Sequence, residues 1–160
     1  MKVKTHPTAR GSAHVGGLPR RRLNYARTRA FAIAIPMEVR MGQIAPIALV
    51  VEDDRIQREL AATLLEESEM GVIECESAEA ALVALEKMGP AVAMIFTDVN
   101  LAGKIDGVEL AHFATELYPN VHVTVTSGYA LPRGLPDGTT FLPKPWLPLD
   151  VLREAERLHH

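Results

Sequence analysis

The sequence predicts an α/β fold, a doubly wound five-stranded parallel sheet with helices on both faces. Three observations support this prediction. From residue 46 onward, short apolar runs alternate with amphipathic stretches, turn residues separate them, and polar residues follow the apolar runs. A short continuous apolar run is typical of a strand buried on both faces. Strands that alternate with helices favour right-handed crossover connections, which place the strands parallel to one another.

Strands and helices are expected in the following order along the chain. The strands span residues 47–51, 71–74, 91–97, 121–126 and 139–142. The helices span residues 54–68, 78–88, 108–118 and 148–158. In the first helix, Ile56, Leu60 and Leu64 lie on one face, with Arg and Glu elsewhere. Ser77 can cap the second helix, and Pro148 opens the last one at a first-turn position.

Residues 127–138 interrupt this alternation. The stretch SGYALPRGLPDG holds two Pro and three Gly. Pro removes a backbone donor and Gly weakens a helix, so together they argue against a regular helix. We expect an irregular, mobile segment here in place of a full helix.

Charge divides the chain near residue 45. Residues 1–45 carry nine Lys or Arg against one acid, a net charge of +8, whereas residues 46–160 carry eight basic and nineteen acidic side chains, a net charge of −11. The first segment shows no sustained hydrophobic period, so we expect a disordered basic extension before one domain over residues 46–160. The extension could be an arm that contacts nucleic acid or anionic lipid, a poor secretion signal, or an artefact of a start site upstream of Met37 or Met41.

Composition excludes several classes of protein. The chain is 48% hydrophobic and 23% charged, which is ordinary for a globular domain. No run approaches the roughly 18 apolar residues of a membrane span. The only cysteine, Cys75, cannot form an intramolecular disulfide, which fits a reducing compartment, so a cytoplasmic protein is expected.

Chemically active side chains lie at the ends of the predicted strands. Glu52 and Asp53 follow the first strand, Asp98 follows the third, Thr126 ends the fourth, and Lys144 follows the fifth. In an open α/β sheet, the ligand crevice lies beyond the carboxyl ends of the strands. We therefore expect these side chains to converge at one edge, although they are far apart in the sequence.

Such a cluster favours phosphoryl chemistry. Carboxylates held together raise one another's pKa unless a cation neutralises them. Mg²⁺ suits oxygen ligands of this kind, with Mn²⁺ as an alternative, and the motifs contain no Cys or His that would favour zinc. A carboxylate beside such a cation and a lysine ammonium is placed to attack phosphorus, and a hydroxyl can stabilise the transition state.

Four segments resemble the motifs of response regulator receiver domains. They are LVVEDD (49–54), IFTDVNLAGKIDG (95–107), VTSGYA (125–130) and FLPKPW (141–146). No single motif is decisive, but all four occur in the right order, each at a strand end. The resemblance covers residues 46–158 and implies a flavodoxin-like sheet of strand order 2-1-3-4-5, the order already known for receivers.

The resemblance also implies a role for each residue of the cluster. Asp98 would accept the phosphoryl group, Lys144 would pair with it, and Thr126 would move toward it. Phe141 would change rotamer with that movement, and the peptide bond between Lys144 and Pro145 would be cis. The implied metal ligands are Glu52 (through water), Asp53, Asp98 and the backbone carbonyl of Asn100.

Several of these residues also have plainer structural interpretations. Phe141 could be a core aromatic and Thr126 a residue that favours a strand. Asp54 is expected to be a helix-start acid, and Asp106 a loop or N-cap acid, rather than metal ligands. The loop after Asp98 lacks the usual proline and is one residue longer than typical, but metal binding is expected to survive.

We therefore expect a stand-alone receiver that takes a phosphoryl group from a histidine kinase or a phosphotransfer protein and loses it by slow hydrolysis. No turnover of a separate substrate is expected. No DNA-binding domain or other output domain is expected either, so the output would be contact with a downstream protein or onward phosphotransfer. Two alternatives stay open: a non-phosphorylated interaction module of the same fold and, with less support, an aspartyl-phosphate phosphatase, whose usual Asp-x-Asp pattern is absent.

Overall fold

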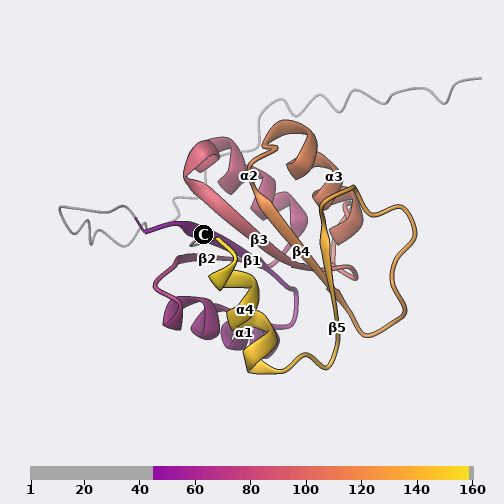
Figure 1. The fold of residues 1–160 in the computed structure, drawn as a ribbon. Helices are drawn as coiled ribbons and strands as arrows, with labels where there is room; N and C mark the ends of the chain where they lie inside the picture. Colours follow the sequence, from indigo (N-terminus) through magenta and orange to yellow (C-terminus); the bar gives the residue numbers. More distant parts are fainter. Residues whose placement is uncertain (1–44, 159–160) are drawn as a thin grey trace, which may run out of the picture. The chain divides into compact units, whose positions relative to one another are not determined.

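A parallel sheet of strand order β2-β1-β3-β4-β5 forms the centre of the computed structural model, which describes residues 45–158 (Figure 1). The strands are β1 (Ile47–Val51), β2 (Gly71–Cys75), β3 (Val92–Asp98), β4 (His122–Ser127) and β5 (Thr140–Pro143). Every neighbouring pair is parallel. The predicted fold class and strand order are confirmed, and the predicted extension over residues 1–45 lies outside the described residues except for residue 45.

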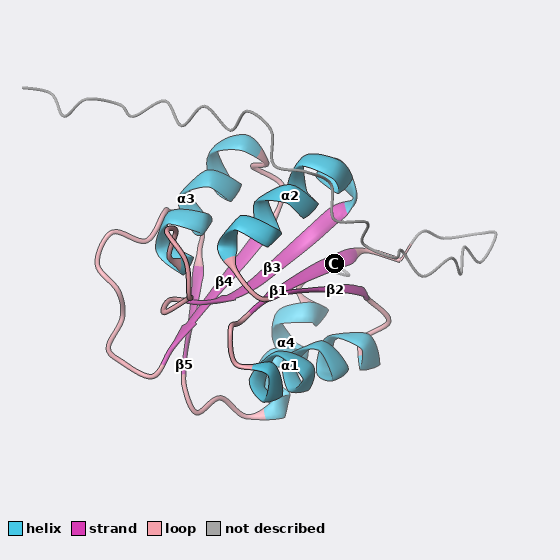
Figure 2. Ribbon diagram, turned by 180° about the vertical axis from the view of Figure 1, so that it is seen from behind, coloured by secondary structure: helices cyan, strands magenta, loops and turns pink. Residues whose placement is uncertain are grey.

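Helices cover both faces of this sheet. They are α1 (Arg55–Glu67), α2 (Ala78–Met88), α3 (Gly107–Leu117) and α4 (Pro148–Glu156), with a 3-10 turn η1 (Gly89–Ala91) after α2. α1 and α4 lie on one face, and α2 and α3 lie on the other (Figures 1 and 2). None of the helices in the described part of the chain combines the length and the hydropathy needed to span a membrane.

Alternation along the strands divides the core into two layers. Leu49 and Val51 of β1 pack into the layer with α2 and α3, whereas Ala48 and Val50 pack into the layer with α1 and α4. This is the two-residue period of a strand buried on both faces. The continuous apolar run of β1 follows from that double burial.

Acidic and hydroxyl side chains begin three of the helices. The Asp54 carboxylate accepts a hydrogen bond from the Gln57 N–H at 2.9 Å, and the Ser77 hydroxyl accepts one from the Ala80 N–H at 3.2 Å. Asp106 caps α3 in the same way and forms a reciprocal capping box with Glu109. The predicted helix-start positions of Asp54, Ser77 and Asp106 are confirmed.

The predicted inner face of α1 is wrong. Ile56 is 77% exposed and Leu60 is 49% exposed, so of the predicted stripe only Leu64 is buried. The buried residues of α1 are Ala61, Ala62, Leu64 and Leu65. Small Ala side chains allow α1 to pack closely against the sheet and α4, which leaves the larger Ile56 and Leu60 in water.

Residues 128–139 form neither helix nor strand, so the absence of a regular helix predicted for residues 127–138 is confirmed, although Ser127 itself ends β4. Gly134 and Gly138 have φ angles of 78° and 82°, a backbone region that favours glycine. The segment is fastened at two points: His112 Nε2 of α3 lies 2.6 Å from the Gly134 carbonyl oxygen, and Leu135 packs against the core. The absence of a helix thus leaves a segment held by few contacts.

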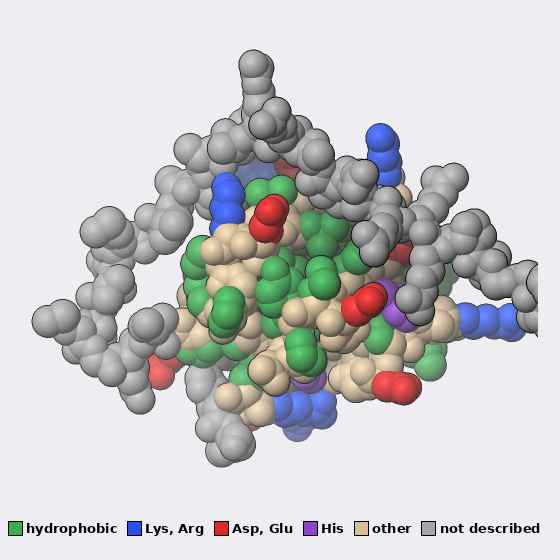
Figure 3. Space-filling model, turned by 90° about the horizontal axis from the view of Figure 1, so that it is seen from above, with side chains coloured by type: hydrophobic (Ala, Val, Ile, Leu, Met, Phe, Trp, Pro, Cys, Tyr) green, Lys and Arg blue, Asp and Glu red, His purple; other side chains and the backbone are tan. Residues whose placement is uncertain are grey.

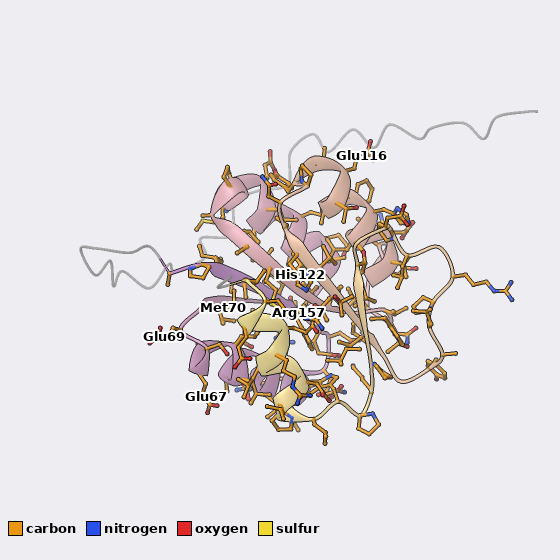
Figure 4. All side chains as sticks on the ribbon, in the orientation of Figure 1. Glu67, Glu69, Met70, Glu116, His122 and Arg157 are labelled. Atoms are coloured by element: carbon orange, nitrogen blue, oxygen red, sulfur yellow. The ribbon has the colours of Figure 1, made fainter. Side chains whose placement is uncertain are left out.

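A network of charged side chains joins the start of β4 to α4, which lies on the same face of the sheet as α1. Glu154 is only 4% exposed, and its Oε2 lies 3.0 Å from His122 Nε2. Arg157 Nη1 donates to the same oxygen at 3.1 Å, and both His122 and Arg157 are labelled in Figure 4. Because a buried charge is costly unless it is paired, these contacts make the position of α4 on the sheet specific.

The surface on the α2 and α3 side is of mixed character. Viewed from above, it shows hydrophobic side chains in the middle of the view and charged side chains mostly around them (Figure 3). Leu117, the last residue of α3, is 63% exposed, although it shares the helical spacing of the buried Leu110 and Ala114.

Candidate functional site

The carboxyl ends of the strands bring the predicted side chains to one edge of the sheet. Glu52 follows β1, and Asp98 is the last residue of β3. In the register between β3 and β4, Asp98 lies beside Thr126. Lys144 follows β5, where its backbone N–H donates to the Ser127 carbonyl oxygen at 2.7 Å. Parallel pairing therefore places residues from four strands beside one another.

Three carboxylates meet at this edge. Glu52, Asp53 and Asp98 each contribute an oxygen, and these oxygens lie within 4.8 Å of one another. Glu52 is 6% exposed and Asp98 is 7% exposed, whereas Asp53 is exposed to water. The cluster thus combines two buried acids with one acid at the surface.

The Lys144 ammonium connects two of these acids. Its Nζ donates to Glu52 Oε2 at 2.7 Å and lies 3.3 Å from Asp98 Oδ1. Asp98 Oδ1 is buried and has no hydrogen-bond partner among the described residues, so the contact with Lys144 is an ion pair without hydrogen-bond geometry. The Lys144–Pro145 peptide bond is cis, as the resemblance implies.

Burial raises the pKa of the Glu52 carboxyl above its ordinary value. The hydrogen bond and the charge of Lys144, together with the Asp54 N–H at 3.2 Å from Glu52 Oε1, act in the opposite direction, and the nearby Asp98 charge adds to the increase. Desolvation therefore outweighs one ammonium, and a further cation would favour the ionised carboxylates.

The Thr126 hydroxyl is buried beside Asp98 and has no hydrogen-bond partner in the described part of the chain. A buried polar group without a partner costs about 1–3 kcal/mol. A ligand oxygen at this position would supply the missing partner. Phe141 is half-buried on β5 beside Val125, and Asn100 is exposed in the loop after β3. The switch role of Thr126 and Phe141 stays a prediction.

Glu79 of α2 holds the loop that follows Asp98, and sequence reasoning missed it. Its Oε1 accepts a hydrogen bond from the Lys104 N–H at 2.8 Å. Gly103, with a φ angle of 134°, lies against the same carboxylate, because a Cβ there would be 2.7 Å from Glu79 Oε2. The other end of the loop is closed by the Gly107 N–H, which donates to the Val99 carbonyl oxygen at 3.0 Å.

Arg58 of α1 is the second residue that sequence reasoning missed. Its Nη1 donates to the Glu52 carbonyl oxygen at 2.7 Å and to the Asp53 carbonyl oxygen at 3.4 Å. Its Nε donates to Glu74 Oε2 of β2 at 3.3 Å. By residue type alone, Arg58 could not be distinguished from Arg55, which lies on the surface of the same helix.

Comparison with known families agrees with this geometry. The family profile of the response regulator receiver domain matches residues 48–148, a range that contains the whole cluster. The chain belongs to the response regulator receiver domain family. It is therefore a domain of two-component signalling, a system in which receivers pair with histidine kinases. No curated protein sequence matches the chain.

Solved receiver structures share the fold over most of their length. The receiver domain of the hybrid histidine kinase CckA is 30% identical, with a TM-score of 0.62, over 71% of this chain and 99% of that chain. The receiver domain of NtrX from Brucella abortus is 27% identical, with a TM-score of 0.60, over 69% and 96%. A response regulator receiver protein from Sinorhizobium medicae is 25% identical, with a TM-score of 0.65, over 71% and 94%.

Proposed function

We propose that Asp98 of this receiver accepts a phosphoryl group from a phosphohistidine of a histidine kinase or phosphotransfer protein in the cytoplasm. One observation carries the proposal: the Lys144 ammonium lies between Glu52 and Asp98 and contacts both carboxylates in a largely buried site. A positive charge fixed beside the acceptor oxygen attracts the anionic phosphoryl group and stabilises charge in the transition state.

The transfer is a direct displacement at phosphorus. A carboxylate oxygen of Asp98 attacks phosphorus, the P–N bond to the donor histidine breaks, and its electron pair stays on the imidazole, which takes up a proton from solvent. Lys144 and the Thr126 hydroxyl are the groups of this chain that would contact the phosphoryl oxygens. Because neither Asp98 Oδ1 nor the Thr126 hydroxyl has a hydrogen bond in the described structure, none must be broken first. Slow attack of water on phosphorus would restore the Asp98 carboxylate.

The carboxylate cluster fits a divalent cation. Its oxygens lie within 4.8 Å of one another, and the buried Asp98 Oδ1 lacks a hydrogen bond. Hard cations prefer oxygen ligands, which favours Mg²⁺, with Mn²⁺ as the alternative. Asp53, Asp98, the Asn100 carbonyl and, through water, Glu52 would hold it. When bound, such a cation neutralises charge on the transferred group.

Exposed apolar side chains on α1 and at the start of α4 favour a protein as the phosphoryl donor. They are Ile56 and Leu60 on α1 and Leu147 and Leu149 at the start of α4, with exposed fractions of 77%, 49%, 66% and 52%. α1 and α4 lie side by side on one face of the sheet (Figure 2). Large exposed apolar side chains that gather in one area are typical of protein contact surfaces.

The output of this receiver would also be a protein contact or onward phosphotransfer. Tyr129 is 78% exposed and Leu131 is 61% exposed in the segment that joins Thr126 to β5. A movement of Thr126 toward the phosphoryl group would pull directly on this segment. Residues 128–139 are therefore proposed to carry the signal to a downstream partner.

The experiment is phosphorylation by a small donor. Acetyl phosphate with Mg²⁺ should add one phosphoryl group, and mass spectrometry after borohydride reduction should locate it at Asp98. Asp98→Asn should abolish the reaction. The matched control is Asp54→Asn, which keeps the cap of α1 because Asn and Asp cap equally well. If Asp98→Asn is phosphorylated as well as the wild type, the acceptor is a different residue. If the wild type takes no phosphoryl group, the non-phosphorylated interaction module becomes the better interpretation.

A further inference from the structure

We propose that Arg58 is a positioning residue of the acceptor site. Its guanidinium holds the backbone of Glu52 and Asp53 so that their carboxylates face Asp98 and can bind the divalent cation. This inference rests on the proposed function, because it concerns the same cation site. It assigns a role to a residue of α1 that belongs to none of the four motifs.

Arg58 is largely buried and makes long-range hydrogen bonds, unlike Arg55 on the same helix. Its side chain is only 14% exposed, and its hydrogen bonds join α1 to the β1–α1 loop and to Glu74 of β2. The Arg55 side chain is 79% exposed, and its hydrogen bond among the described residues goes to Glu59 one turn further along α1. Burying a guanidinium is costly unless its donors are satisfied, so the Arg58 contacts are a specific feature of this site.

The Arg58 hydrogen bonds act on the proposed ligands through the main chain. Nη1 donates to the carbonyl oxygens of Glu52 and Asp53 at 2.7 and 3.4 Å. The Glu52 carboxylate is also held by Lys144, whereas the exposed Asp53 carboxylate accepts no hydrogen bond from the described residues. The direction of the Asp53 side chain therefore depends on its backbone. Arg58 holds this backbone from α1, in addition to the hydrogen bond from the Asp54 N–H to the Glu52 carboxylate.

Two effects of Arg58 on cation binding have opposite signs. Its positive charge repels a cation, so loss of the charge alone would tighten binding. Its hydrogen bonds order two ligands, so loss of the bonds alone would weaken binding. Repulsion is weakened by the water around the exposed Asp53, whereas partners that orient metal ligands typically change metal affinity by about 10–100-fold. Positioning should therefore dominate.

The test is the affinity of the full chain for Mg²⁺, measured by calorimetric titration with magnesium chloride in the absence of a phosphodonor. Arg58→Lys keeps the charge but loses the forked donors, and we expect it to weaken binding by about tenfold or more. Arg58→Gln should also weaken binding. Arg55→Gln, the matched control on the same helix, should leave the affinity unchanged. Equal affinity of Arg58→Lys and the wild type, or tighter binding by Arg58→Gln, would overturn the proposal.

A second variant covers the case in which the Arg58 variants do not fold. Glu74→Gln removes the charged partner of Arg58 Nε but leaves Glu52, Asp53 and Asp98 intact, and it should weaken Mg²⁺ binding to a smaller extent, by about threefold. An unchanged affinity would then overturn the role of Arg58. Failure of the cation site can be distinguished from failure of the Arg58 role alone. If the wild type binds no Mg²⁺, or if Asp98→Asn binds it as well as the wild type does, the proposed cation site is wrong, and the role of Arg58 is wrong with it.

Discussion

Gly107, the first residue of α3, lies against the backbone of Asp98 and allows a specific prediction. A Cβ at this position would overlap the Asp98 carbonyl oxygen and would be 2.8 Å from the Asp98 carbonyl carbon and 3.0 Å from Val99 Cα. Carbon atoms pack at about 3.5–4.0 Å, so Gly107→Ala would force the end of β3 and α3 apart by about 1 Å. All the atoms in the way belong to the backbone, and no side-chain rotation can relieve the overlap.

Gly107→Ala should therefore lower both stability and phosphorylation. Overpacking costs about 1–3 kcal/mol, and we expect about 3 kcal/mol here because the obstacle is rigid. With an m-value of about 2 kcal/mol per molar urea, the unfolding midpoint should fall by about 1.5 M. A displacement of about 1 Å at the acceptor should slow phosphorylation by acetyl phosphate by about 100-fold. The helix propensity of Ala opposes this loss by at most about 1 kcal/mol.

The matched control is Gly128→Ala. A Cβ at Gly128 would meet nothing within 4 Å, and its φ angle is outside the left-handed region. Replacement of glycine at such a position stabilises a protein by about 0.4–1 kcal/mol through the unfolded state. If Gly107→Ala behaved like Gly128→Ala in the urea titration, the close approach of Gly107 to Asp98 would not constrain the protein.

Three further predictions follow from the described residues. Burial raises the pKa of the Glu52 carboxyl in the folded protein above its value in the unfolded chain, which is near 4.5. The stabilisation by the protonated carboxyl is therefore complete below pH 4.5 and is lost as the pH rises through the pKa of the folded protein. The stability of Glu52→Gln relative to the wild type should thus increase from pH 4 to pH 7 in urea unfolding, and a constant difference would contradict the desolvation of Glu52. Burial also raises the pKa of the Cys75 thiol to about 12. Its alkylation by iodoacetamide at pH 8 should be on the order of 1,000-fold slower than that of an exposed thiol until the protein unfolds, and rapid reaction of the folded protein would refute this. Amide exchange in residues 128–139 should slow on phosphorylation, and Tyr129→Asp should abolish partner binding without affecting phosphorylation; identical exchange in both states would place the output surface elsewhere.

The sequence was sufficient for the sheet because its signals are local. The apolar runs that became β1 and β3 could be recognised without any knowledge of the partner strands, and the alternation with helices implied parallel pairing. The strand-end rule then predicted that Glu52, Asp98 and Lys144 would meet. The strand order itself came only from the resemblance to receivers, since nothing in the residues states which strands are neighbours.

The contacts that the sequence could not predict are long-range or depend on close packing. A hydrophobic stripe on α1 was visible, but Ile56 and Leu60 are exposed, because the buried surface of α1 is formed largely by Ala residues. Arg58 and Glu79 reach residues 16 and 25 positions away, and no local pattern marks such partners. The sequence therefore predicted which side chains meet at the edge of the sheet, but not the residues that support them.

The contact between Glu79 and the β3–α3 loop has a consequence for engineering this receiver. Glu79 belongs to α2, yet it holds the turn at Gly103 and Lys104 that follows the acceptor strand. A chimera that exchanges this loop for that of another receiver would leave the Glu79 carboxylate facing a backbone it no longer fits. An exchange of residues 79–107 together would preserve the Glu79 carboxylate, the turn at Gly103 and Lys104 that it holds, and the contact of Gly107 with Asp98. The smallest exchangeable part of the site thus begins on a helix that contributes nothing to the carboxylate cluster.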